Sequence, residues 1–115
     1  MKLLNRTALL VRPKQPFVDW VNSLEEDASL LLAQGDSIND HNIYLVDEVL
    51  DDNHLENVLR RIHRFIFESE LFGWWTEERD WPKQRGYKTF RAWFNVEYHT
   101  MITDLGKKPL VLEEF

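Results

Sequence analysis

One long amphipathic helix constrains most strongly what this chain can fold into. From residue 53 to residue 73, apolar side chains recur every three or four positions, which is the spacing of one helix face. They are Leu55, Val58, Leu59, Ile62 and Ile66. Asn53 followed by Glu56 fits a capping box, and Gly73 is typical of a helix end. The pattern predicts a helix about 30 Å long that buries this stripe.

Phe67 falls outside the apolar stripe of this helix. At 100° per residue it points into the polar face, which also carries Arg60 and Arg64, with Leu71 one turn away. A solvent-exposed Phe forgoes about 1.5–3 kcal/mol of burial free energy. We therefore expect Phe67 to be covered, either by residues 74–94 folding back over the helix or by a partner.

The segment before the long helix predicts two strands and a short helix. Residues 6–12 form a short apolar run ended by Pro13, which is typical of a buried strand. Helical spacing follows at Phe17, Trp20, Val21 and Leu24. Residues 25–41 give no clear pattern beyond a short helical turn over 30–33, and residues 42–46 are rich in β-formers. A second strand is expected there.

The segment after the long helix predicts a capped turn, a helix and two strands. Thr76 fits the start of a short turn before Pro82, and Tyr87, Phe90 and Phe94 follow at helical spacing. Residues 96–105 alternate like a strand, with Glu97 and His99 on one face. A turn over 106–109 then leads to a short apolar run over 110–112, which we expect to pair as the edge strand of a hairpin.

The element order is therefore β-α-β-α-α-β-β. The first three elements predict a right-handed parallel crossover, and the last two strands an antiparallel hairpin. The expected fold class is α+β, with a three- or four-stranded mixed sheet and helices mainly on one face. Residues 1–115 have the length of a single compact domain.

Charge is distributed unevenly along the chain. The net charge is −6, yet the eight cations of residues 60–91 outnumber the acids there, and residues 15–59 contain no Lys or Arg. Two interpretations stay open. Either the acidic and basic segments face each other or lie on different solvated faces, or the basic segment docks an acidic partner. The overall acidity argues against nucleic acid as a partner.

Composition also bears on location and cofactors. The chain has no cysteine, which excludes disulfides and thiolate zinc sites and fits a reducing compartment. Its apolar runs near the N-terminus are too short for a signal peptide or a membrane helix. We expect a cytoplasmic protein with no membrane partner, no structural metal and no cofactor.

The candidate catalytic residues are Glu97 and His99. No glycine-rich phosphate loop, zinc-protease motif or nucleophile elbow occurs in the sequence. A two-residue step places both side chains on one face of a strand, where a carboxylate can orient an imidazole base or share a metal. The pair therefore predicts either a small hydrolase or metal-dependent enzyme, or only a polar pair on an open sheet face.

The candidate binding residues lie in the aromatic-basic segment, residues 60–94. Mixed Trp and Arg side chains stack internally, form protein interfaces or bind nucleic acid. The residues singled out are Arg60, Arg64, Phe67, Trp74, Trp75, Arg79, Trp81 and Arg85. The favoured hypothesis is a non-enzymatic binding or assembly module that uses this segment to hold a protein partner or a second copy of the chain.

Three stretches carry a resemblance. They are LLNRTALLVRPKQPFVDWVN, IYLVDE and GWWTEERDWPKQRGYKTFRAWFNVEYHTMITDL. Together they resemble a family of short uncharacterised bacterial proteins. The resemblance implies a bacterial cytosolic origin and assigns no activity, cofactor or site.

Overall fold

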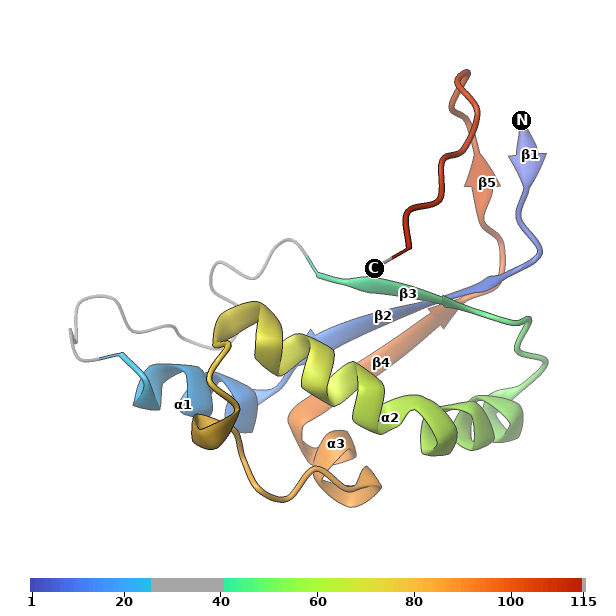
Figure 1. Cartoon of the computed structure of the whole chain (residues 1–115). Helices are drawn as coiled ribbons and strands as arrows, with labels where there is room; N and C mark the ends of the chain where they lie inside the picture. The colour runs from blue at the N-terminus through green and yellow to red at the C-terminus, as the bar shows by residue number, and fades with distance from the viewer. Residues whose placement is uncertain (26–40, 115) are drawn as a thin grey trace.

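The fold is α+β, as predicted, with a three-stranded sheet covered by helices on one face (Figure 1). The computed structural model describes residues 1–25 and 41–114. The predicted helical turn over 30–33 lies outside the described residues. No helix in the described ranges is long and apolar enough to cross a membrane.

The central sheet has the order β3-β2-β4. Its strands are β2 (Thr7–Pro13), β3 (Ile43–Val46) and β4 (Phe94–His99). A separate two-stranded ribbon pairs β1 (Lys2–Leu3) with β5 (Thr103–Asp104) and stands away from the sheet (Figure 1). The helices are α1 (Gln15–Ser23), α2 (Asp52–Trp74) and α3 (Tyr87–Trp93), with a 3-10 turn, η2 (Glu78–Asp80), before α3.

The predicted parallel crossover is wrong, because β2 pairs antiparallel with both β3 and β4. The sheet is therefore purely antiparallel rather than mixed. Handedness rules constrain a crossover only once the strands are known to be parallel. The connection from residue 14 to residue 42 is long enough for the chain to return in either direction.

The predicted terminal hairpin is also wrong. The expected strand over 96–105 is interrupted, because β4 ends at His99 and the chain turns to pair β5 with β1. Residues 110–112 pair with no strand in the described part of the chain, and their side chains are exposed. A period-two pattern does not reveal that a strand changes sheet midway, since both halves keep the alternation.

The core lies between the sheet and the three helices. Leu9 and Val11 of β2 pack with Phe17 of α1 and Phe90 of α3, all nearly without solvent exposure. The first half of α2 buries the predicted stripe through Leu55, Val58 and Leu59. Its second half buries Ile66 of the stripe together with Phe67, Glu70 and Leu71, so the buried face rotates along the helix.

The helix start also differs from the prediction. The N-cap of α2 is Asp51, whose carboxylate accepts the backbone N–H of His54 at 2.8 Å. Asn53 was the predicted cap, but it already lies inside the helix. Asp51 and Asn53 are both good capping residues, so the sequence offered two starts of similar strength.

Candidate interaction surface

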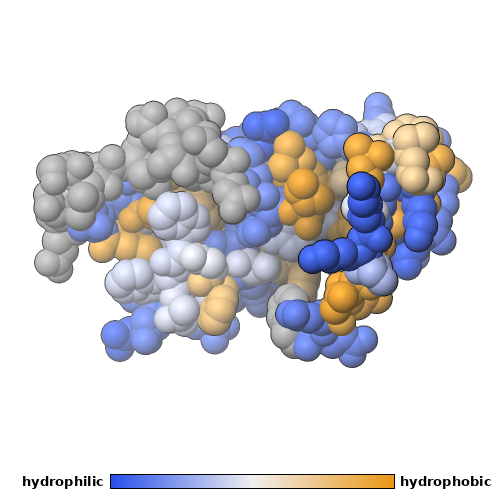
Figure 2. All heavy atoms as spheres, turned by 90° about the horizontal axis from the view of Figure 1, so that it is seen from above, coloured by the Kyte–Doolittle hydropathy of each residue, from blue (hydrophilic) through white to orange (hydrophobic). Residues whose placement is uncertain are grey.

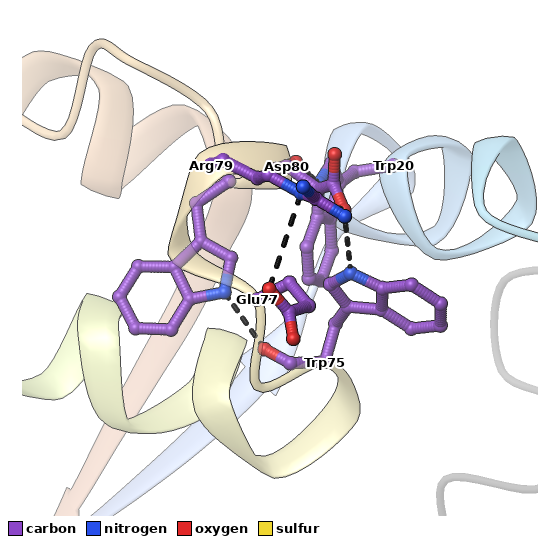
Figure 3. A network of polar contacts seen from close by, with 6 residues as sticks. Trp20, Trp75, Glu77, Arg79 and Asp80 are labelled. Carbon is purple, nitrogen blue, oxygen red and sulfur yellow. Dashed lines mark hydrogen bonds and ion pairs between the residues drawn. The ribbon is translucent and has the colours of Figure 1, made fainter.

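The chain between α2 and α3 forms a corner held by indole hydrogen bonds; we call residues 74–81 the aromatic turn (Figure 3). Trp75 ends α2 in an extended conformation, and its indole N–H donates to the Asp80 carboxylate at 2.9 Å. The Trp81 indole donates to the Trp75 carbonyl at 2.7 Å. From α1, the Trp20 indole donates to the Asp80 carbonyl at 3.0 Å. Three satisfied indoles thus fix the backbone of the turn.

Part of the aromatic turn remains open to solvent. Trp74 is 44% exposed and Trp75 37%, and the Arg79 side chain, which is 81% exposed, shares the Asp80 carboxylate with the Trp75 indole. The Arg79 guanidinium is 3.9 Å from the Glu77 carboxylate and 4.0 Å from Asp80, so its ion pairs are long and solvated. The exposed aromatic and cationic side chains of the aromatic turn are therefore Trp74, Trp75 and Arg79, which we call the Trp-Arg patch.

Phe67 does not belong to an accessible surface. It has no solvent exposure, so the expectation that it is covered is confirmed. The cover is intramolecular: its ring packs against Phe90, Trp93 and Phe94. Of the two alternatives from the sequence, the chain itself closes over the helix.

The other predicted binding residues also make internal contacts. Trp81 is buried, and Arg85 lies over its ring at 5.8 Å while donating to the Pro82 carbonyl at 2.7 Å. The Arg60 guanidinium sits 4.5 Å from the centre of the Tyr87 ring. Arg64 pairs loosely with Glu68 at 3.6 Å and stays largely exposed. Much of the aromatic-basic segment therefore packs within the chain, and the surface that it leaves exposed for a partner is the Trp-Arg patch.

Glu97 and His99 lie together on the open face of the sheet, opposite the helices. The His99 Nε2 atom is 3.6 Å from a Glu97 carboxylate oxygen, and both side chains are well exposed. The other Glu97 oxygen accepts the Arg12 Nε–H at 3.2 Å. No group of three acidic or histidine side chains that could hold a metal occurs in residues 1–25 and 41–114. A cation already neutralises Glu97, and water reaches the pair freely.

Two cavities lie elsewhere. One of about 430 Å³ opens between β3 and the first half of α2, with Arg6, Asp47, His54 and Arg61 among its lining residues. The other, about 300 Å³, lies at the base of the β1–β5 ribbon and includes Leu3 and Met101. Neither of these two cavities is lined by Glu97, His99 or the Trp-Arg patch.

A buried polar cluster escaped the sequence analysis. Glu70 of α2 is only 7% exposed and accepts hydrogen bonds from the Asn42 amide at 2.5 Å and the Tyr44 hydroxyl at 2.8 Å. Burial raises the pKa of Tyr44 well above its ordinary value. The helical spacing itself indicated that Glu70 could be buried, since Glu70 lies one turn beyond the buried Ile66. Predicting the cluster also required knowing that the buried face of α2 rotates.

No protein-family model, curated protein or solved structure matches this chain at a significant level. The geometry of the described residues therefore carries the functional argument.

Proposed function

We propose that the protein is a non-enzymatic, cytoplasmic protein-binding module whose Trp-Arg patch seats a partner protein. The observation that carries the proposal is the combination of exposure and fixation at this patch. Trp74 and Trp75 keep more than a third of their surfaces open, while hydrogen bonds to Asp80 and within the turn hold the backbone beneath them. Rigid aromatic side chains bind with little loss of conformational entropy.

The chemistry of the patch indicates the kind of partner. Trp and Arg are the residues that most often dominate the binding energy of protein interfaces. Within the part of the chain that the structure describes, the ion pairs of Arg79 are long and exposed, so a carboxylate of a partner can replace them at small cost. A partner with apolar side chains bordered by acidic residues fits these groups. The lack of cysteine supports a reducing compartment as the place where the protein binds its partner.

Site-specific photo-crosslinking from the patch tests the proposal. A photoreactive phenylalanine analogue replaces Trp74, and the matched control carries it at Phe65, which is more exposed but lies outside the patch. In extract of the source cells, position 74 should give one dominant crosslinked protein that position 65 does not give. Arg79→Glu should remove that product, because the cation is lost while the fold keeps its core.

The opposite result is equally clear. Products of the same pattern and yield from positions 74 and 65, or a product that survives Arg79→Glu unchanged, would contradict a binding role for the Trp-Arg patch.

A further inference from the structure

A second surface, unrelated to the Trp-Arg patch, is an apolar arm that projects from the body. It consists of residues 1–5 and 100–114 and includes the β1–β5 ribbon (Figure 1). Seven of the fourteen exposed large apolar side chains in the described part of the chain belong to it. They are Met1, Leu3, Met101, Leu105, Leu110, Val111 and Leu112. Seen from above, hydrophobic and hydrophilic side chains are intermixed at the end of the molecule where the arm stands (Figure 2).

Residues 107–112 of the arm have the chemistry of a strand but pair with no strand among residues 1–25 and 41–114. Leu110, Val111 and Leu112 are 63%, 80% and 91% exposed, which shows that they are not seated on their own chain. Two lysines precede them, at positions 107 and 108, and Pro109 between the lysines and the apolar residues is compatible with an edge strand. Such an exposed apolar segment is costly in water and is a ready surface for association.

Strand β3 offers an open edge that such a segment can extend. It pairs only with β2 among the described residues, so its outer backbone groups have no strand partner there. Ile43 is 61% and Leu45 51% exposed, both on the sheet face away from the helices. Asp47 and Glu48 follow directly and are exposed. An edge of this kind, apolar and without a Lys or Pro to block it, recruits another strand.

One antiparallel register matches the two segments in both apolarity and charge. Placing Leu112 opposite Ile43 puts Leu110 opposite Leu45, and residues directly opposite in a sheet share a face. The same register sets Lys108 against Asp47 and Lys107 against Glu48. The parallel alternative instead brings the acids at 113 and 114 toward Asp47 and Glu48, where like charges repel.

We propose that residues 107–112 of one copy add to β3 of a second copy as an antiparallel strand, so that two chains exchange arms. Each copy supplies one arm and one edge, so the contact is self-complementary, as in a twofold dimer. The exposure of the arm in its own chain and the charge match of the register together identify the occupant as a second copy.

Charge reversal on either side, followed by mixing, tests the exchange by light scattering. The wild type should grow in mass with concentration, from 13.9 kDa toward twice that value. K107E/K108E alone and D47K/E48K alone should each associate about tenfold or more weakly. An equimolar mixture of the two variants should associate again, because each arm then meets an edge of opposite charge.

Single cysteines test the register, and the chain has no native cysteine to interfere. L110C mixed with a size-tagged L45C should form a tagged–untagged disulfide on oxidation, because facing Cβ atoms lie about 4.5–5.5 Å apart, close to disulfide reach. The control is L110C with a tagged L50C, since Leu50 is more exposed than Leu45 but lies beyond β3. That pair should give little product.

Four results would overturn the proposal. The first three are a wild-type mass of 13.9 kDa at every concentration, a mixture of charge variants that stays as dissociated as its components, and equal disulfide yields at positions 45 and 50. Charge variants that alter only the melting temperature of a monomer would place the arm on its own chain and would also overturn the exchange.

Discussion

The ring of Phe67 meets the ring of Phe94 edge-on, with centroids 5.3 Å apart and planes at 85°. Phe67 lies on α2 and Phe94 begins β4, so this contact joins the long helix to the sheet. It does so through the helix face that the sequence pattern predicted to be polar. Both rings are almost without exposure. An aromatic that first looked misplaced on its helix is a centre of the core.

Phe67→Ala should therefore destabilise the fold by about 3–5 kcal/mol, the range for deleting a buried Phe. The oligomeric state should not respond, because the cover comes from the same chain. Denaturant unfolding checks the first expectation and light scattering the second. Phe65→Ala, at a side chain 69% exposed, is the control and should change stability by less than about 0.5 kcal/mol. Equal effects of the two substitutions would contradict the burial of Phe67.

Asp51→Ala should cost about 1 kcal/mol, because it removes the acceptor for the His54 N–H at the start of α2. Asn53→Ala should be nearly neutral, since Asn53 lies inside the helix and caps nothing. Urea unfolding of both variants compares the two candidate starts directly. A larger loss from Asn53→Ala would place the helix start two residues later.

Stability should fall as the pH rises above about 10, and Tyr44 is one cause. Burial raises the pKa of Tyr44 above its ordinary value of 10.0, so above that pH the unfolded chain loses this proton while the folded chain keeps it. The unfolded state then binds fewer protons, and the free energy of unfolding decreases with pH. Chemical unfolding between pH 9 and pH 11 should show a steeper decline for the wild type than for Tyr44→Phe. Parallel curves would contradict this role.

Glu97→Gln and His99→Ala should each change stability by less than about 1 kcal/mol, as exposed ion pairs do. Thermal and urea unfolding provide the measurement, with Arg12→Gln as the companion variant because Arg12 shares the Glu97 carboxylate. A loss above about 3 kcal/mol for any of the three would indicate a buried, essential network on this face.

The elements were predictable where one physical pattern dominated. Helix α2 and strand β2 follow from apolar spacing, and the alternation of β4 correctly places Glu97 and His99 on one face. The coverage of Phe67 follows from the cost of exposing a ring. These are local inferences, and each depends on residues close together in the sequence.

The features that the sequence did not predict depend on contacts between segments that are distant in the sequence. The direction of β3 relative to β2, and the switch of the chain from β4 into the ribbon, are fixed by packing rather than by spacing. Within the aromatic-basic segment, composition could not separate Trp81 and Arg85, which pack inside, from Trp74 and Arg79, which face water. The exposed Trp75 indole donates to the Asp80 carboxylate and the buried Trp81 indole to the Trp75 carbonyl, so both are satisfied, and only packing against the core distinguishes them.

The central position of β2 sets the order in which the chain can fold during synthesis. Its β4 neighbour is encoded far downstream: Arg12 and Glu97, which pair across the two strands, are 85 positions apart. While the ribosome is still adding the intervening residues, β2 has one open side and the apolar face of α2 lacks Phe90 and Phe94. Closure of the core is therefore a late, long-range step, and pausing translation before residue 94 should leave an aggregation-prone intermediate.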